Sequence, residues 1–396
     1  MKTKKQYTVL CKIICVISCY AIAFFITDPT LSKWNNQQVI TTTNHETEQP
    51  AFSTTYIAPE FPHEKNHVSS ITPLDENRIM CVWYAGSKEG APDVSIYAAI
   101  REKNKWSSPQ RLVDLNISSK ELNRYVRKVG NAVVFKDAED TLWLFYCSVS
   151  LGGWAMARTN YRYSRDNGKT WSRSKELFLN PFLSLSNNVK NKPLVFKNGS
   201  FLLPLYQEFI NKYGIALWGK WEDNELKYIV KRIGNHQRTL QPTLVRSEDA
   251  GLIAFFRNRD KGSMLQSKSI NSGINWSPVK KANLPNPNSG FDMLHIREKE
   301  FIGVINYSPT ERDNLVLVYT NNSGKKWHIL HYLETAIPVE QDERFKLIGK
   351  KSHYYQYPSI IKHNGNYHLS YTCFEKIKHT TFNEVWLREK IKKVNK

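Results

Sequence analysis

The stretch Ser164-Arg165-Asp166-Asn167-Gly168-Lys169-Thr170-Trp171 has the composition of a tight turn, and its pattern recurs twice in weaker form, at residues 269–276 and 320–327. In such an octet Asp or Asn binds nearby backbone N–H groups, Gly takes a positive φ, and Trp packs the turn onto a sheet. The three starts are separated by 105 and 51 residues. These separations are about two units and one unit of a repeat near 50 residues, which predicts a propeller-like array.

Six segments share a second pattern, in which a short apolar strand, a polar turn and another apolar strand follow one another. Their turns are rich in Asp, Asn, Glu, Lys and Gly, which is typical of β-hairpins. The segments span residues 67–83, 131–145, 192–205, 241–256, 292–305 and 357–371. Because two independent signals share one period, the sequence favours an all-β fold, a six-bladed β-propeller, over a β-sandwich with accidental spacing.

The N-terminal part of the chain predicts export. Four lysines and no acid occur in residues 1–12, and an uncharged, mostly apolar run follows at 13–26. If Lys12 reaches the interface, about 20 residues are available to span a bilayer. We expect residues 1–27 to be a signal peptide or a signal-anchor helix. The protein is then anchored in an inner membrane facing the periplasm, or is periplasmic or secreted if the leader is cleaved; lipoprotein-type cleavage near Cys19 is a third, weaker reading.

The rest of the chain predicts a linker, one domain and a short tail. Residues 28–58 are rich in Thr, Asn, Gln and Glu and have no sustained hydrophobic period, so we expect a polar linker. Residues 59–385, about 330 in number, suffice for a single propeller and leave no room for a second domain. Residues 386–396 read as a basic C-terminal tail.

The cysteines outside the leader fall in predicted strands of different blades and lack the spacing of metal ligands. They are Cys81, Cys147 and Cys373. We therefore expect buried free thiols and neither a metal nor a cofactor.

The formal net charge of +20, from 56 Lys and Arg against 36 Asp and Glu, favours an anionic ligand. No zinc-finger, helix-turn-helix or RNA-binding motif is present, which argues against nucleic acid. An anionic glycan or glycoconjugate such as lipopolysaccharide fits an exported protein better, although a merely solvated basic surface explains the charge equally well. We expect membrane contact through the N-terminal segment only, and a monomer.

The innermost strands of a propeller begin around a central funnel, where ligands collect. The first position of each repeated segment is polar or aromatic, and we expect all six to line one cup: His67, Asn131, Lys192, Gln241, Asp292 and Tyr357. For any single position, a hydrogen-bonded residue of the channel is the simpler interpretation.

With its three turn octets and six repeats, the chain resembles the sialidase (neuraminidase) superfamily, and in particular its bacterial BNR-repeat branch. The similarity covers roughly residues 60 to 380. The phrases that carry it are Trp83–Asp93, Asn191-Lys-Pro193, Gln241-Pro-Thr243, Leu284–Gly290 and Tyr357–Ile360.

The resemblance implies a retaining exo-glycoside hydrolase that removes a terminal acidic sugar, sialic acid or a related one. Since a carboxylate nucleophile would be repelled by the sugar carboxylate, the family uses a tyrosine, which matches Tyr357. Asp93 matches the acid/base residue. Arg257 and Arg312 match two of three arginines that clamp the substrate carboxylate.

Two positions depart from the family pattern. His67 stands where the first clamp arginine is expected, and Gln241 stands where a glutamate would activate the tyrosine. An amide cannot accept the phenol proton, and an unactivated phenol is a poor nucleophile at pH 7. Asp292 or His67 is then the substitute base, with Asn131 and Lys192 as further binding residues. The alternative is a propeller that binds anionic glycans without this chemistry.

Overall fold

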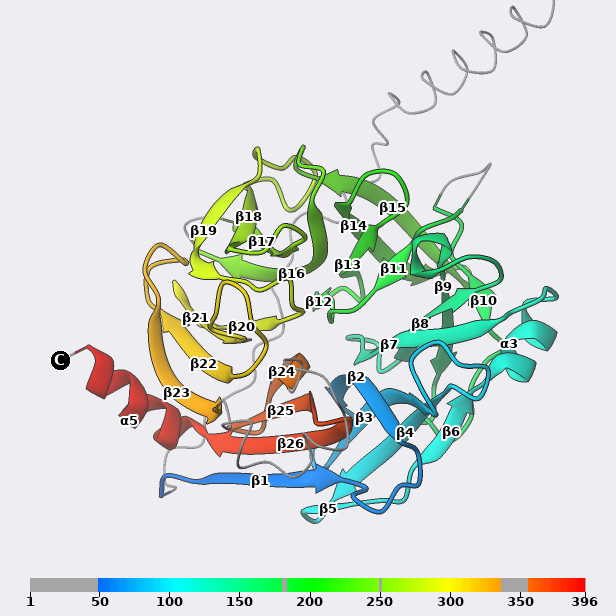
Figure 1. Ribbon diagram of the computed structural model, residues 1–396, viewed down its shortest axis with the longest axis horizontal. Helices are drawn as coiled ribbons and strands as arrows, with labels where there is room; N and C mark the ends of the chain where they lie inside the picture. Colours follow the sequence, from blue (N-terminus) through cyan, green and yellow to red (C-terminus); the bar gives the residue numbers. More distant parts are fainter. Residues whose placement is uncertain (1–48, 180–183, 249–250, 336–354, 396) are drawn as a thin grey trace, which may run out of the picture. The chain divides into compact units, whose positions relative to one another are not determined.

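The computed structural model describes residues 49–179, 184–248, 251–335 and 355–395. These residues form six β-sheets, arranged as blades around a central axis with the first strand of each blade innermost (Figure 1). The predicted six-bladed, all-β propeller is thereby confirmed. The expected leader at residues 1–27 lies outside the described residues. In the described part of the chain, no helix is both long and apolar enough to cross a membrane.

The blades are antiparallel sheets, numbered here in chain order. Blade 1 contains β2 (Lys65–Pro73), β3 (Arg78–Gly86), β4 (Ser95–Glu102), β5 (Lys105–Trp106) and β6 (Gln110–Val113). Blade 2 contains β7 (Lys128–Lys136), β8 (Leu142–Val149), β9 (Arg158–Ser164) and β10 (Lys175–Glu176). Blade 3 contains β11 (Asn188–Val189), β12 (Leu194–Val195), β13 (Phe201–Gln207), β14 (Tyr213–Glu222) and β15 (Glu225–Ile233).

The second half of the propeller is built in the same way. Blade 4 contains β16 (Thr239–Ser247), β17 (Gly251–Asn258), β18 (Ser263–Ser269) and β19 (Lys280–Pro285). Blade 5 contains β20 (Asp292–Arg297), β21 (Glu300–Ile305), β22 (Leu315–Thr320) and β23 (His328–Glu334). Blade 6 contains β24 (Tyr355–His363), β25 (Asn366–Cys373), β26 (Lys376–Asn383) and the N-terminal strand β1 (Phe52–Ile57). Within the described ranges the helical elements are α3 (Leu115–Glu121), the 3₁₀ turn η1 (Trp154–Met156) and α5 (Glu384–Val394).

Both ends of the propeller domain differ from the sequence-based expectation. Strand β1 lies within the range expected to be linker and pairs with β26 from Phe52↔Phe382 to Ile57↔Ile377. The pairing supplies the fourth strand of blade 6 and covers an edge that would otherwise be open. The expected basic tail is helix α5, because Asn383 caps its first turn and Trp386, Leu387 and Ile391 are buried in the core.

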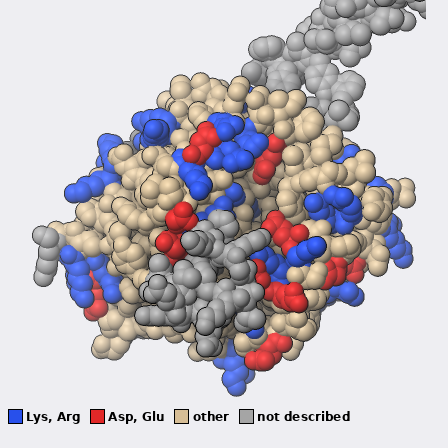
Figure 2. Space-filling view, viewed as in Figure 1, with Lys and Arg blue, Asp and Glu red and all other residues tan. Residues whose placement is uncertain are grey.

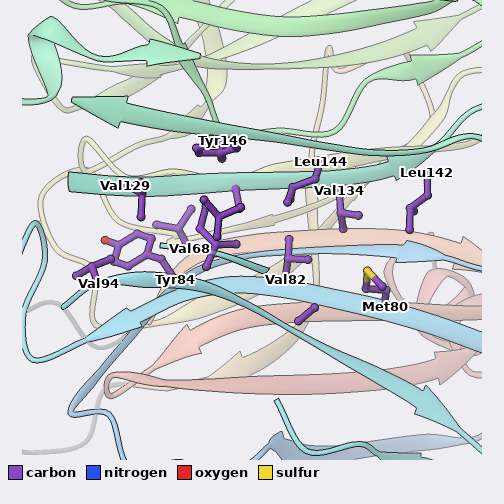
Figure 3. Close-up of a cluster of buried hydrophobic side chains, with 14 of the residues drawn as sticks. Val68, Met80, Val82, Tyr84, Val94, Val129, Val134, Leu142, Leu144 and Tyr146 are labelled. Atoms are coloured by element: carbon purple, nitrogen blue, oxygen red, sulfur yellow. The ribbon is translucent and has the colours of Figure 1, made fainter. Parts of the chain in front are cut away.

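The core lies between neighbouring blades. In β8, the second strand of blade 2, both faces are covered: all eight residues are buried, and Ser148 is the one polar residue among them. Figure 3 shows one such cluster, in which Met80 and Val82 of blade 1 face Val134 and Leu144 of blade 2. The three cysteines outside the leader are buried and free, as expected.

The three turn octets connect the third and fourth strands of blades 2, 4 and 5. In the first octet, Asp166 accepts hydrogen bonds from the Thr170 backbone N–H (2.9 Å) and hydroxyl (2.6 Å), and Gly168 donates to Ser164 (2.8 Å). The glycines of the three octets have φ of 85°, 86° and 80°. Because strands alternate in direction, these turns lie at the opposite end of each blade from the start of its first strand. We call that other end, where the first strands begin, the cup end.

Candidate functional site

The first strands of four blades share a backbone irregularity at the cup end. One residue there has positive φ: Val68 (52°), Asn131 (42°), Gln241 (44°) and Tyr357 (52°). In each case the pairing with the second strand shifts register at the same place. Such bulges re-aim side chains and are found beside functional sites. In blade 1 the equivalent residue is Val68, so His67 lies one position earlier than the repeat pattern placed it.

Tyr357 lies beside one of the two arginines expected at the site. Nη1 of Arg257, at the end of β17, is 3.3 Å from the Tyr357 hydroxyl and donates to Oε1 of Gln241 at 3.1 Å. Tyr357 is half-buried. The structure therefore brings together three residues that are 16 and 100 positions apart in the sequence.

Arg312, from the loop between β21 and β22, approaches the same place. Both arginines bind Asn288: Nε of Arg257 donates to its side chain at 2.7 Å, and Nη2 of Arg312 donates to its carbonyl. Arg312 Nη1 donates to Gln356, the neighbour of Tyr357, at 3.0 Å. Burial lowers the pKa of Arg312 and the nearby Tyr357 opposes that effect, but a guanidinium remains charged at neutral pH. Nε of Arg312 is buried and has no hydrogen-bond partner among the described residues.

Tyr206, at the end of β13, joins Asn131 to Gln241. Its hydroxyl lies 3.3 Å from the side-chain nitrogens of both residues. Burial raises its pKa well above the usual value, so it stays a neutral hydrogen-bonding group. His67 lies on the other side of Tyr357, with the two rings edge to face at 4.9 Å, and its Nδ1 is 3.1 Å from the Thr372 hydroxyl.

Lys190 lies below the tyrosine and was not singled out by the sequence analysis. It is fully buried, with Nζ 6.0 Å from the centre of the Tyr357 ring. Nζ donates to Asn191 Oδ1 (2.7 Å) and to the carbonyls of Phe291 (3.2 Å) and Pro358 (2.7 Å). Burial lowers the pKa of Lys190 to about 7. The lysine therefore ties the start of blade 6 to blades 3 and 5 directly beneath the site.

The structure does not bring Lys192 and Asp292 into the cup with the other first positions. Asp292 is 1% exposed, and its carboxylate accepts from Thr243 Oγ1 (3.0 Å), Met293 N (2.9 Å), Ile360 N (2.9 Å) and the ammonium of Lys192. Thr243 and Ile360 lie two and three residues beyond Gln241 and Tyr357. The pair is thus one layer deeper in the channel, where it links blades 3 to 6.

Asp93 is placed on the loop between β3 and β4, as a cup-end residue, but its carboxylate is bound within that loop. It accepts from the Ser87 backbone (2.7 Å) and hydroxyl (3.0 Å). Slight burial raises its pKa, but these hydrogen bonds outweigh that effect and leave the pKa below the usual value. Glu89, on the same loop, reaches the neighbouring blade instead and accepts from Trp154 Nε1 at 3.0 Å.

Glu208 is an acidic residue at the cup that the sequence analysis missed. It follows β13, two residues after Tyr206, and is close enough to Tyr206 for its charge to contribute to the raised pKa of that phenol. Burial raises the pKa of Glu208, and the charge of Arg257 is the first of three cationic neighbours that oppose this shift. Among the described residues its carboxylate has no hydrogen-bond partner. The one signal for Glu208 in the sequence is its position directly after an apolar strand.

The charge on the face in Figure 2 is mixed: Lys and Arg side chains are spread across it with Asp and Glu among them. The cup itself concentrates positive charge from Arg257 and Arg312. No group of three His, Cys, Asp or Glu that would suit a metal ion occurs in the described ranges. The arrangement therefore suits a small anion held beside a phenol.

A family model described as "BNR repeat-like domain" matches residues 77–369, well over half of the chain. No curated protein matches. Among solved structures, the Hadza microbial sialidase Hz136 superposes with a TM-score of 0.63 at 11% identity, covering 81% of this chain and 66% of its own. The chain thus spans just under two thirds of that sialidase.

Two further solved structures superpose on the propeller. A Dyadobacter fermentans protein of unknown function has a TM-score of 0.63 at 12% identity and covers 83% of this chain and 97% of its own. The NanB sialidase from Streptococcus pneumoniae has a TM-score of 0.61 at 11% identity and covers 84% of this chain and 70% of its own. At these identities the likeness establishes the fold.

Proposed function

Because the chain belongs to the BNR repeat-like domain family and shares its fold with sialidases, we propose that it is a sialidase-like exo-glycoside hydrolase that removes a terminal acidic sugar. The observation that carries the proposal is the convergence of Arg257 and Arg312 beside the half-buried Tyr357. Two guanidinium groups recognise a sugar carboxylate by charge-assisted hydrogen bonds.

In the proposed reaction Tyr357 is the nucleophile and the anomeric configuration is retained. Its oxygen bonds to the anomeric carbon as the bond to the leaving oxygen breaks, and the phenol proton passes to a base. Water then attacks the same carbon and displaces the tyrosine. We propose His67 as the base, since its ring lies edge to face beside that of Tyr357, whereas the Asp292 carboxylate already accepts from four donors.

Glu208 is the proton donor that we propose in place of Asp93. A general acid must hold a proton near neutral pH, which requires a raised pKa. Burial raises the pKa of Glu208, whereas hydrogen bonds from Ser87 leave that of Asp93 lowered. Glu208 gives its proton to the leaving oxygen and, as a carboxylate, takes one from the attacking water.

The test is product release from a panel of acidic-sugar glycosides, with matched neutral glycosides as substrate controls. Tyr357→Phe should abolish hydrolysis, since it removes only the hydroxyl. Arg312→Ala should weaken binding of acidic sugars by about 2 kcal/mol or more and leave neutral sugars unaffected. Glu208→Gln should lower kcat at least tenfold, while Asp93→Asn should have a small effect. The reverse order for the last two variants would restore Asp93 as the acid/base.

A second candidate function is glycan binding without hydrolysis, and Gln241 is the observation that favours it. Its amide, bound to Arg257 and Tyr206, occupies the position of the expected activating glutamate. If the base has been lost, Gln241→Glu should raise a trace rate on the order of tenfold or more. If His67 serves as base, the added charge should lower activity, and activity should be lost in acid once the imidazole is protonated. Zero hydrolysis by wild type and Gln241→Glu, with measurable glycan binding, would leave the binding function.

A further inference from the structure

Exposed apolar side chains are concentrated at the cup end. Nine large hydrophobic residues are exposed in the described ranges, and six of them lie in cup-end connections: Tyr125, Leu151, Phe178, Phe209, Ile210 and Tyr307. Of the other three, Phe52 and Tyr332 are on the outer strands β1 and β23, and only Ile270 lies in a turn at the opposite end. Scattered surface residues would show no such bias, so one face of the propeller is selectively apolar.

Three of these residues belong to a continuous strip above blades 3 to 5. Backbone hydrogen bonds join its loops in sequence: Lys212 N to Gln237 O (3.1 Å), Arg259 N to Arg238 O (3.1 Å) and Gly262 N to Pro309 O (3.0 Å). Phe209 and Ile210 are 51% and 81% exposed at the tip of the first loop, and Tyr307 is 39% exposed in the last.

Cations lie between these apolar residues. Arg259 and Lys261 are exposed in the loop between β17 and β18, and Arg238 pairs with Asp260 beside them. In Figure 2 a group of Lys and Arg side chains, with acids next to it, lies over the part of the face that Figure 1 draws in green. We define the aromatic–basic rim as Phe209, Ile210, Tyr307, Arg238, Arg259 and Lys261.

We infer that the aromatic–basic rim docks the propeller onto an anionic lipid bilayer. Phe, Ile and Tyr at protruding loop tips insert into the headgroup region, and Arg and Lys beside them bind lipid phosphates. The net charge of +20 complements a negative surface. Phe209 and Ile210 project from one loop and Tyr307 from another, with cations between them, which suits a lipid surface better than the close-packed core of a protein interface. This contact is additional to the one expected from the N-terminal segment.

Docking through the rim would determine which substrates reach the site. Arg257 lies at the end of β17, directly before the loop that carries Arg259 and Lys261, and Arg312 shares the loop between β21 and β22 with Tyr307. Docking through the rim would therefore point the cup at the bilayer. Glycans attached to lipid headgroups would then be presented to the site. The inference does not need catalysis, because docking is measurable with Tyr357→Phe.

The experiment uses the full chain with a single added tryptophan and vesicles that contain brominated phospholipid. The test variant is Phe209→Trp, and the matched control is Ile270→Trp, which is exposed at the opposite end. Both keep the N-terminal segment, so any membrane contact through that segment is the same in the two proteins. Vesicles with phosphatidylglycerol should quench the added fluorescence of Phe209→Trp at least twofold more than that of Ile270→Trp. The difference should shrink with phosphatidylcholine alone, and also in 0.5 M salt, which screens charge.

A second pair of variants tests the charges. Arg259→Gln/Lys261→Gln should reduce quenching of Phe209→Trp by phosphatidylglycerol vesicles several-fold, whereas Lys169→Gln/Lys325→Gln, in the turn octets, should not. Equal quenching at positions 209 and 270 would overturn the inference. So would quenching at 209 that is indifferent to lipid charge, since this would mark a merely hydrophobic surface.

Discussion

Gly290 lies directly against the ring of Tyr357: a Cβ added at Gly290 would be 2.7 Å from Cδ1 of the tyrosine and 3.0 Å from Oε1 of Gln241. The loop that contains Gly290 also supplies Asn288 to both arginines. Gly290→Ala should therefore tilt the half-buried ring toward the cup and lower turnover at least tenfold, without removing any polar group. Kinetics and the melting temperature measure the two effects. Gly153→Ala, where a Cβ has nothing within 4 Å, is the control; normal turnover in Gly290→Ala would show that ring placement is unimportant.

Asp292 should be a structural residue and not a base. Asp292→Asn leaves Lys192 without its charged partner in a buried layer, which should cost about 3 kcal/mol or more of unfolding free energy. Denaturant titration measures this loss. Asp140→Asn, which breaks a pair with Lys136 in which the aspartate is 88% exposed, should cost less than about 1 kcal/mol. A stable but inactive Asp292→Asn protein would instead indicate a catalytic carboxylate.

The octet glycine should matter for stability only. Gly168 has φ of 85°, and a Cβ there would be 2.7 Å from Cε of the buried Met80. Gly168→Val should lose about 1 kcal/mol or more from strain alone, plus a packing penalty. Gly262→Val shares the same φ but has nothing within 4 Å, so the difference between the two variants isolates packing. Since the octet is at the end opposite the cup, sugar binding by folded Gly168→Val should be unchanged.

A buried histidine pair should make the fold sensitive to acid. His368 and His379 are stacked, with ring nitrogens 3.2 Å apart. Burial lowers the pKa of His368 to about 3 and that of His379 well below the usual value. The unfolded chain therefore binds protons that the folded chain does not as pH falls from about 6.5 toward 3. Unfolding free energy should fall by about 1.4 kcal/mol per pH unit for each histidine in that window.

The variant His368→Gln should reduce this pH dependence by the contribution of one histidine. Urea titrations at pH 6, 5 and 4 measure the slope, and the carboxylates common to both proteins cancel in the comparison. An unchanged slope would mean that the pair is not the source of acid sensitivity.

The sequence by itself determined the repeat and the turns. An octet such as Ser164–Trp171 closes on its own atoms, because Asp166 and Gly168 bind groups within the same few residues. Such local chemistry can be recognised in the sequence, and the spacing of these turns and of the hairpins predicts the six blades. The buried cysteines follow in the same way from their places in short predicted strands. The predicted pairing of Tyr357 with two arginines rested on the family resemblance, and the structure does bring the three residues together.

Only the tertiary structure decided which polar residues reach the cup. A shift of one residue at a bulge separates Val68 from His67, and two residues along a strand separate Gln241, which binds Arg257, from the layer of Thr243 and Asp292. The burial that raises the pKa of Glu208, and the contact between Gly290 and Tyr357, arise from blades far apart in the sequence. Residue type is local information, whereas burial, charge and reach depend on how distant strands converge, and that convergence is a property of the folded chain alone.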